Sequence, residues 1–403
     1  MTAPATVLFA HSGRDWIRGS ERCLLDLIAR LDRTRFTPVL ACESRVLADA
    51  AGALGAEIEH VPEWRDGWRP PMEQVRRVQR IVQAHGVRLV HANNLIPIPS
   101  VLPVARSGGI PVVAHIHLMM TREERLHSWL HQAAAIVGVS RHVVAGLLDD
   151  GMPPSRVHVV YNGIDRSRLD AGNACALRTS LGIAPHAFVA TVVGSLIEIK
   201  GQRVIIDAIG ALRAAGVDAH LLMVGDGEAR PALEAQAAAL GLTGHVHVLG
   251  ERGDVGAMLR DATDVAVTAS RMEAFPLNVL EAQYARVPVV ASDIPAHREG
   301  VVVDATGLLF PPGDAGALAA HLAALATAPD RRRAMGEAGH ARVLERFLVE
   351  RYADEFQALY RALLAEPASR HGWRGSVWPA AYGEWIRGAV GRRLARVRHR
   401  ARA

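Results

Sequence analysis

The chain has 403 residues, half of them hydrophobic, and a formal net charge of +5. This length allows about two domains that each bury a full core, and the composition excludes a disordered or fibrous protein. The charge is concentrated at the end, because nine arginines and two glutamates lie from Glu366 to Ala403. The rest of the chain carries a net charge of about −2, so we do not expect it to bind nucleic acid.

Cysteine spacing and hydropathy indicate the compartment. The three cysteines, Cys23, Cys42 and Cys175, are scattered without metal-ligand spacing, which predicts reduced thiols. The apolar run 7–10 is too short for the core of a signal peptide and leads into a glycine loop, so we expect a first strand there. No uninterrupted apolar stretch is long enough to span a bilayer. We therefore expect a cytoplasmic protein.

The N-terminal half alternates short apolar runs with helical patterns, which predicts a parallel sheet covered on both faces. The strands expected are 6–10, 38–42, 88–92, 111–116, 135–139 and 157–161. In the glycine loop after the first strand, Gly19 or Ser20 can cap a helix over 23–31. This loop lacks the Gly-x-Gly-x-x-Gly pattern, so it does not indicate a dinucleotide site.

Two histidines, His115 and His117, end the fourth expected strand. The carboxyl end of a parallel strand is where open α/β sheets bind ligands, and strand alternation puts both side chains on one face. For His115, a structural role in the core with satisfied hydrogen bonds is the alternative.

The second half repeats the α/β rhythm after a segment, 171–186, that shows no strand period and is expected to be a linker. The strands expected are 188–193, 220–224, 246–249, 265–268, 288–291 and 307–310. A long helical region should follow from 331 to about 365.

Two glutamates follow the strand 265–268. Glu273 lies in the strand-to-helix loop, and Glu281 lies on a helix that should open near Pro276, with the proline in its first turn. Free backbone N–H groups at a helix start attract phosphate. A loop carboxylate can bond sugar hydroxyls and a helix carboxylate a ribose diol, so this stretch can hold a nucleotide sugar. Two solvated surface glutamates are the alternative interpretation.

This Glu-x7-Glu pair, within Ser-Arg-Met-Glu-Ala-Phe-Pro-Leu, resembles the donor-site signature of retaining glycosyltransferases of family 4. Further segments are similar to that family: the glycine loop, the position of His117, the Asn-Gly-Ile-Asp turn at 162–165 and the Gly-x-Leu…Lys-Gly segment at 194–201. The resemblance covers about 6–365. It implies an α/β GT-B fold, with two Rossmann-like parallel-sheet domains facing a central cleft. These would be an acceptor domain 1–170, a donor domain 187–346, a helix 347–365 crossing back to the first domain, and a tail 366–403.

The resemblance also implies roles for individual residues. Glu273 would orient donor-sugar hydroxyls, Lys200 would neutralise the diphosphate, and His117 would lie at the reacting end of the sugar. The acceptor-side loop would contain Gly19 and Ser20. The remaining donor-binding residues would be Glu281, Ser195, Gly194, Phe275, Pro276, Leu277 and Arg252. No Asp-x-Asp motif ends a strand, so we expect metal-independent catalysis and no cofactor beside the nucleotide-diphosphate sugar.

Ser195 departs from the family pattern, which commonly has arginine directly after the glycine. A serine donates one hydrogen bond to phosphate but brings no charge. The expected function is the retaining transfer of a sugar to a glycan or lipid-linked acceptor, in cell-surface polysaccharide or glycolipid synthesis. One alternative is a non-catalytic GT-B protein that binds a nucleotide sugar or a partner enzyme. Another is a sugar-nucleotide epimerase, which would need proton-transfer groups that the sequence does not show.

The tail 373–403 combines tryptophans and a tyrosine with clustered arginines, a composition typical of segments that lie on an anionic membrane surface. This predicts peripheral attachment to the inner face of a membrane. The alternative is a basic extension whose tryptophans pack on the first domain.

Overall fold

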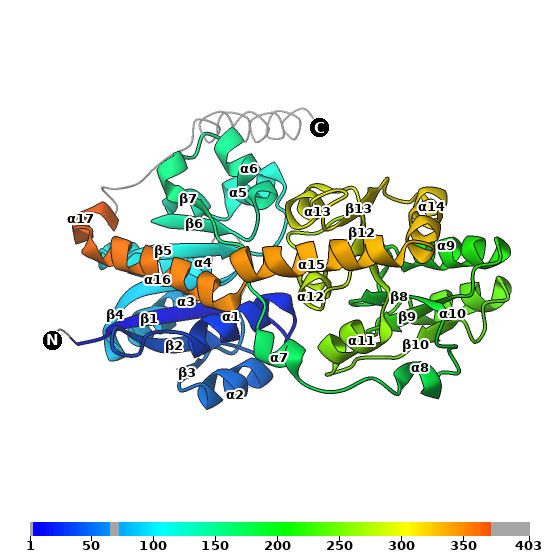
Figure 1. The fold of residues 1–403 in the computed structure, drawn as a ribbon. Helices are drawn as coiled ribbons and strands as arrows, with labels where there is room; N and C mark the ends of the chain where they lie inside the picture. Colours follow the sequence, from blue (N-terminus) through cyan, green and yellow to red (C-terminus); the bar gives the residue numbers. More distant parts are fainter. Residues whose placement is uncertain (1–2, 65–71, 372–403) are drawn as a thin grey trace, which may run out of the picture. The chain divides into compact units, whose positions relative to one another are not determined.

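The computed structural model describes residues 3–64 and 72–371. They divide into two α/β units (Figure 1). The first unit takes in residues 1–161 and 352–403, and the second is the continuous stretch 162–351. The predicted tail 373–403 lies outside the described residues.

The first unit is built on a seven-stranded parallel sheet of order β3-β2-β1-β4-β5-β6-β7. Its strands are β1 (Ala5–His11), β2 (Phe36–Cys42), β3 (Glu57–His60), β4 (Val87–Ala92), β5 (Val112–Ile116), β6 (Ala135–Gly138) and β7 (Val157–Val159). The sequence prediction missed β3 because its four residues, Glu-Ile-Glu-His, include only one apolar side chain. This strand lies at the sheet edge, where it needs no apolar faces.

Helices connect these strands: α1 (Gly19–Ala29), α2 (Arg45–Ala53), α3 (Met72–Ala84), α4 (Ile98–Ser107), α5 (Arg122–His127) and α6 (Arg141–Asp149). The prediction that Gly19 or Ser20 caps the first helix is wrong. Both are helical residues, and Arg18 is the N-cap. The helix starts earlier than expected because the carboxylate of Glu21 accepts a hydrogen bond from the backbone N–H of Arg18 at 3.0 Å, which stabilises the first turn.

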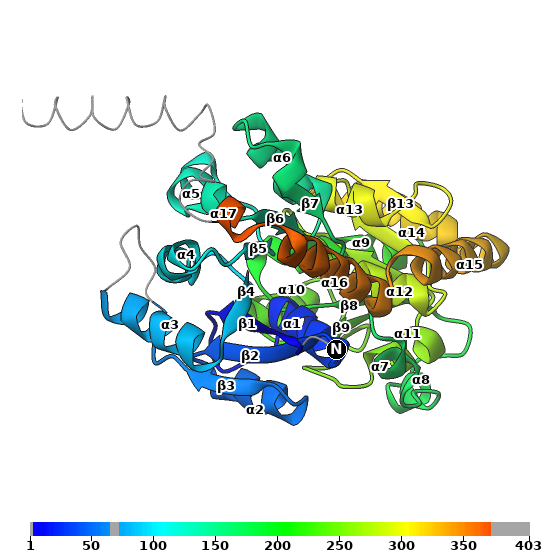
Figure 2. The same cartoon turned by 90° about the vertical axis from the view of Figure 1, so that its left-hand side faces the viewer.

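The first unit is completed by α16 (Val349–Ala365) and α17 (Ala368–His371). Tyr352, Phe356 and Tyr360 of α16 are fully buried, and the Tyr360 hydroxyl lies 2.5 Å from His91 Nδ1 on β4. Both views of the ribbon show α16 beside the strands of this unit (Figures 1 and 2). The expected return of the last helix to the first domain is confirmed.

The second unit has a six-stranded parallel sheet of order β10-β9-β8-β11-β12-β13. Its strands are β8 (Phe188–Val193), β9 (Ala219–Val224), β10 (Val246–Val248), β11 (Val265–Thr268), β12 (Val289–Ser292) and β13 (Gly307–Phe310). Its helices are α7 (Arg166–Asp170), α8 (Leu177–Ser180), α9 (Gln202–Ala214), α10 (Arg230–Ala239), α11 (Val255–Ala262), α12 (Leu277–Tyr284), α13 (Pro295–Gly300), α14 (Ala315–Ala326) and α15 (Pro329–Arg346). Two aliphatic clusters on opposite faces of β8 and β9 form much of its core.

The predicted linker 171–186 contains α8, and its residues Ala174 and Ile183 are buried against β8, β9 and α11. It is therefore packed onto the second unit.

The helical region from α15 to α16 is interrupted at 347–348. There Ile164 donates a backbone hydrogen bond to Phe347 at 2.9 Å and accepts one from Val349 at 3.1 Å. Gly163 lies directly beside this crossing, and a Cβ at Gly163 would come within 2.5 Å of the Val349 Cα. The glycine of the Asn-Gly-Ile-Asp turn is thus required by a close approach of two backbones.

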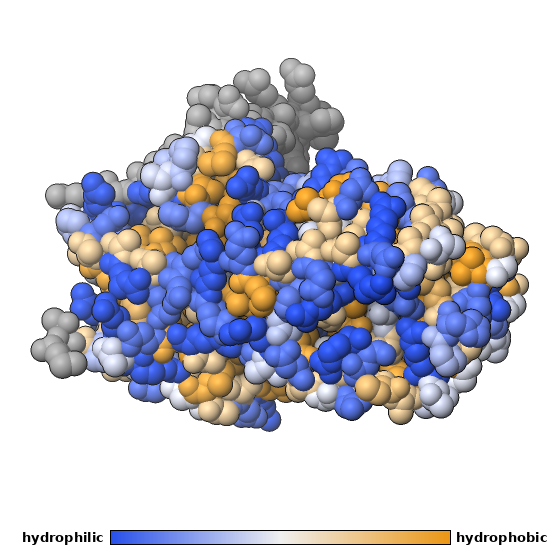
Figure 3. Space-filling model, in the orientation of Figure 1, coloured by the Kyte–Doolittle hydropathy of each residue, from blue (hydrophilic) through white to orange (hydrophobic). Residues whose placement is uncertain are grey.

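Large exposed apolar side chains are dispersed among polar ones on the face that Figure 3 shows. Three large apolar residues that are exposed directly precede or follow predicted site residues: Leu118, Ile199 and Met272. Within 3–64 and 72–371, no helix is both long and apolar enough to cross a membrane.

Candidate active site

The carboxyl ends of β8 and β11 bring Lys200 and Glu273 together in the second unit. Lys200 Nζ lies 2.5 Å from Glu273 Oε1, and the Ser270 hydroxyl donates to the same oxygen at 2.7 Å. The two side chains are 29% and 13% exposed. A partly buried ion pair with a further hydrogen bond holds the carboxylate in one orientation while leaving the ammonium group accessible.

A glycine makes this approach possible. Gly201 has a φ of 67°, and a Cβ there would lie 2.3 Å from the carbonyl oxygen of Ala269. The loop after β8 therefore packs directly on the end of β11, and Arg271 donates a backbone hydrogen bond to Ile199 at 2.9 Å. Backbone contacts between the two loops therefore fix the positions of both Lys200 and Glu273.

The helix after this loop is α12. It begins at Leu277, with Pro276 at the N-cap position, one residue before the first-turn position that the sequence suggested. Phe275 is buried and its ring packs on Phe347, with centroids 5.7 Å apart. Glu281 lies about one turn along α12 and is half-buried. The helix start, with free N–H groups, thus lies between Glu273 and Glu281 in the chain.

The Gly194–Ser195 turn after β8 is shaped by its neighbours. Gly194 has a φ of 145°, and its N–H donates to Val224 at 2.9 Å. The carbonyl oxygen of Ser195 accepts from the Gln202 side chain at 2.9 Å. The described contacts of Ser195 thus use its backbone, and its half-buried side chain brings no charge to this edge.

Arg252, predicted to bind the donor, is paired with a neighbouring carboxylate. It lies in the exposed loop after β10 and forms two hydrogen bonds with Asp254, at 2.8 and 2.6 Å. Its charge is therefore largely compensated by a neighbouring carboxylate in this structure.

One residue near the donor edge was missed by the sequence prediction. His297 on α13 is fully buried, and its Nδ1 donates to the carbonyl oxygen of Ser292 at 2.7 Å. Its Nε2 has no partner among the described residues. Burial lowers the pKa of His297, although the Glu273 charge opposes this shift. The signal that could have identified it is a histidine shortly after the strand predicted at 288–291.

The first unit contains a buried polar network at the carboxyl ends of β1, β4 and β5. His11 Nε2 lies 3.0 Å from Glu21 Oε1, and Asn93 Nδ2 lies 3.1 Å from His11 Nδ1. His117 Nε2 lies 3.2 Å from Asn93 Oδ1. Asn93 Nδ2 also donates to the carbonyl oxygen of Ser20, which fixes the orientation of its amide.

This network determines which nitrogen of each histidine carries the proton. Burial raises the pKa of Glu21, but the hydrogen bonds from His11 and the backbone outweigh it and bring the pKa to about 2. The ionised carboxylate accepts from His11 Nε2–H, so His11 Nδ1 accepts from Asn93. Asn93 Oδ1 then accepts from His117 Nε2–H. Burial is the main cause that lowers the pKa of His117, to about 3. His117 is therefore neutral at pH 7, with the Nδ1 lone pair outside this chain of bonds.

Gly13 leaves the space for this network, since a Cβ there would lie 2.8 Å from His11 Nε2. Gly19 has no atom near its absent Cβ, so packing does not explain the glycine at that position.

His115 packs against His117, with ring centroids 3.9 Å apart, which confirms that both lie on one face. It is fully buried, and neither ring nitrogen has a hydrogen-bond partner among the described residues. His115 is thus a core residue, as the alternative interpretation has it, but its hydrogen bonds are not satisfied by the described residues. Burial lowers the pKa of His115 and, to about 3, that of His91, so both are neutral core rings.

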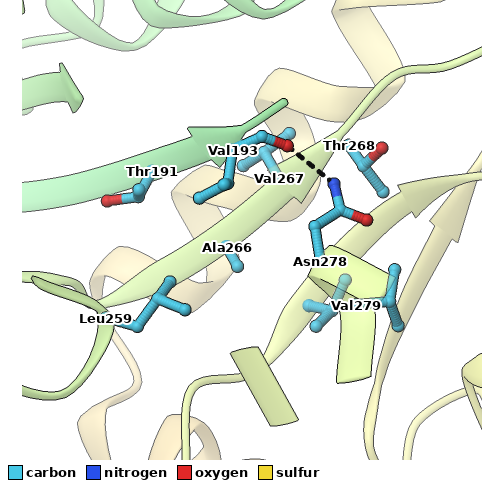
Figure 4. Close-up of a pocket in the computed structure, with 9 residues that line it drawn as sticks. Thr191, Val193, Leu259, Ala266, Val267, Thr268, Asn278 and Val279 are labelled. Carbon is cyan, nitrogen blue, oxygen red and sulfur yellow. Dashed lines mark hydrogen bonds between the residues drawn. The ribbon is translucent and has the colours of Figure 1, made fainter. Parts of the chain in front are cut away.

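A small cavity in the second unit lies beneath α12 and is distinct from the Lys200–Glu273 edge. Figure 4 shows Asn278 reaching across it to the carbonyl oxygen of Val193, 3.0 Å away. Its volume is about 10 Å³, room for about one water molecule. It cannot hold a sugar nucleotide.

Residues 176–342 match the family described as Glycosyl transferases group 1, and residues 17–168 match Glycosyltransferase Family 4. The chain is 30% identical to the D-inositol 3-phosphate glycosyltransferase of Actinosynnema mirum over 311 residues, which are 74% of this chain and 73% of that protein. The chain belongs to the family 4 glycosyltransferases.

Other relatives of this family 4 chain match shorter stretches. The D-inositol 3-phosphate glycosyltransferase of Segniliparus rotundus is 32% identical over 216 residues, 52% of this chain and 48% of that protein. That of Rhodococcus erythropolis is 32% identical over 242 residues, 56% of this chain and 54% of that protein. The chain thus spans about half the length of these two curated relatives.

Solved structures support the fold of the family. HepE of Anabaena with UDP superimposes with a TM-score of 0.76 at 21% identity, covering 89% of this chain and 100% of that one. A glycosyltransferase from Rickettsia africae gives a TM-score of 0.78 at 18% identity, covering 90% and 100%. Two parallel Rossmann-like sheets of seven and six strands make this a GT-B fold, as expected.

Proposed function

We propose that this protein transfers a sugar from a nucleotide-diphosphate sugar to an acceptor hydroxyl, with retention of anomeric configuration. The observation that carries the proposal is the Lys200–Glu273 pair at the carboxyl edge of β8 and β11. Such edges bind nucleotides in open α/β sheets. Membership of family 4 makes sugar transfer the expected chemistry of this edge.

The leaving group of such a reaction is a diphosphate. Lys200, the N–H groups at the start of α12 and the Ser195 hydroxyl would stabilise its negative charge. Since Lys200 forms an ion pair with Glu273, the diphosphate would share an ammonium group that the carboxylate positions. Because groups of the protein itself would neutralise the phosphate charge, we propose that catalysis needs no divalent ion.

The sugar and the nucleoside would be held by carboxylates. Glu273 would accept hydrogen bonds from donor-sugar hydroxyls, and Glu281 would accept them from the ribose diol. His117, neutral at pH 7, would accept a hydrogen bond from the sugar through its Nδ1. The first unit would take the acceptor, with Gly19 and Ser20, the first residues of α1, at its edge.

We propose a hexosyl donor and a glycan or lipid-linked acceptor, in cell-surface polysaccharide or glycolipid synthesis. UDP-glucose is the first donor to test, because HepE of Anabaena, which shares the fold, has been solved with UDP-glucose. Free D-inositol 3-phosphate is an acceptor to include, since several relatives carry that activity in their names.

Binding and turnover of donor test the proposal together. Titration calorimetry with UDP and UDP-glucose should show binding that Glu281→Ala weakens by about 10- to 100-fold, the loss of a charged hydrogen bond worth about 1.5–3 kcal/mol. Glu345→Ala is the matched control, because this exposed glutamate lies on α15 of the same unit. Equal effects of the two variants would contradict the ribose assignment.

Turnover separates an enzyme from a non-catalytic binder, the alternative that Ser195 motivates. A panel of nucleotide sugars with EDTA present should give nucleotide-diphosphate release, and NMR of the product should show retained configuration. Donor binding without release for any sugar would support the non-catalytic protein. Activity that requires added metal would contradict the metal-independent mechanism.

A further inference from the structure

Four titratable side chains gather at the amino ends of β9 and β10, away from the carboxyl ends that carry the candidate active site. Asp218 and His245 directly precede β9 and β10, and His220 and His247 each lie within the first two residues of these strands. The two strands are neighbours in the sheet. Nothing in the proposed sugar transfer uses these residues.

Three of these side chains have the spacing of metal ligands. One carboxylate oxygen of Asp218 and one ring nitrogen each of His220 and His245 all lie within 4.8 Å of one another. The two rings have centroids 5.0 Å apart. Donors about 2.1 Å from one tetrahedral zinc ion lie about 3.4 Å from each other. Side-chain rotations that move these donors by about 1 Å would therefore bring all three onto one ion.

The fourth residue, His247, can orient one of the ligands. Its Nε2 lies 3.2 Å from His220 Nδ1, so one proton is shared between these two nitrogens. On the other side of the ring, His220 Nε2 lies 3.5 Å from Asp218 Oδ1, too far for an ordinary N–H···O bond. When His220 Nδ1 donates to His247, the Nε2 lone pair points toward the carboxylate. A second hydrogen bond of this kind is typical of metal-bound histidines.

A nitrogen donor that the described part of the chain leaves without a partner also favours a cation at this place. His245 Nδ1 is shielded from solvent without a partner among the described residues.

Arg213 opposes metal binding, because its guanidinium lies 2.9 Å from Asp218 Oδ1. This bond uses one carboxylate oxygen and leaves the other for the ion. The net contribution of Asp218 should therefore be smaller than that of either histidine.

We propose that Asp218, His220 and His245 bind a first-row divalent metal ion of the zinc class, with His247 as the positioning residue for His220. Imidazole nitrogens with one carboxylate oxygen are donors that suit such an ion. The ion would join the starts of β9 and β10. Because β10 has three residues and lies at the sheet edge, this link would stabilise the weakest part of that edge.

The experiment is zinc titration of the tag-free full chain by calorimetry, with thermal unfolding at each ratio. We expect one high-affinity ion per chain and a raised unfolding temperature. His220→Ala and His245→Ala should each lower zinc affinity at least about tenfold, and His247→Ala should lower it by about 10- to 100-fold. The control is His321→Ala, a histidine of α14 that bonds to the Leu309 carbonyl, and it should bind zinc as the wild type does.

Cobalt substitution gives a readout that does not depend on stability. Bound Co²⁺ should show the visible absorption of tetrahedral coordination, and His245→Ala should abolish it. Zinc binding of equal affinity in the wild type and in both ligand variants would place the ion elsewhere and overturn the proposal. The absence of binding by the wild-type chain would also overturn it. Donor binding should be unchanged in all these variants, so the result is independent of the proposed function.

Discussion

The close contact between the loops after β8 and β11 leads us to predict that Gly201→Ala destabilises the second unit. A Cβ at this position meets the Ala269 carbonyl oxygen at 2.3 Å, and the φ of 67° is unfavourable for any residue with a Cβ. The left-handed backbone costs about 1 kcal/mol and the overpacking about 1–3 kcal/mol. We therefore expect Gly201→Ala to lower the free energy of unfolding of the second unit by about 2–4 kcal/mol.

Gly216→Ala is the matched control. Gly216 has a similar φ of 84°, but nothing lies within 4 Å of its absent Cβ. It should cost only the backbone term of about 1 kcal/mol and leave donor affinity unchanged. Gly201→Ala should also weaken donor binding, because relief of the clash separates Lys200 from Glu273.

The assay must report on the second unit specifically. None of the seven tryptophans of the chain lies within 162–351, so tryptophan fluorescence does not follow this unit. Hydrogen exchange of peptides from β8 and β11 in increasing urea would measure its stability directly. Equal destabilisation by the two variants would refute the argument that the close approach, and not the φ angle, requires Gly201.

Three further predictions address other parts of the site. Ser195→Arg adds a charge beside the expected diphosphate, so donor affinity or turnover should rise; a folded variant without activity would mean that the pocket is shaped around serine. Glu21→Gln weakens the charged hydrogen bond to His11 and should lower kcat about tenfold without changing donor affinity. The exposed control, Glu73→Gln, should change neither kcat nor donor affinity. Equal kinetics for both variants would contradict a role of the Glu21–His11–Asn93–His117 network in turnover. Acid should destabilise the first unit, because His91 and His117 have folded pKa values of about 3, below the ordinary value of about 6.5. The unfolded chain binds more protons between these values, so stability is full above pH 6.5 and falls below it, by about 1.4 kcal/mol per histidine at pH 5.5; an unchanged urea midpoint by tryptophan fluorescence would contradict this.

The elements that could be predicted are those whose signal is local. The strands β8, β11 and β13 have the bounds expected from the sequence, because a buried parallel strand is a continuous apolar run. The start of α1 could not be predicted, since it depends on the Glu21 side chain, which also binds His11. The strand β3, with one apolar residue among its four, carries no such run and escapes detection.

For the site, the individual residues were identifiable but their partners were not. Lys200 and Glu273 each follow a strand, yet their contact depends on β8 and β11 being neighbours in the sheet although some seventy residues separate them. The same holds for Asn93, which was not predicted because asparagine after a strand is common in loops. Its role arises only where β1, β4 and β5 end together.

The first unit is discontinuous in the chain, and this has a consequence for its folding during synthesis. Its sheet is made from residues up to Val159, but Tyr352 and Tyr360, which fill its core, are made almost two hundred residues later. Closing so long a loop is slow and costs entropy. The second unit is continuous and can fold as soon as it has been made. We therefore expect the part of the chain that is synthesised first to be the last to complete its fold, with the rings of His91 and His115 exposed to water until α16 arrives.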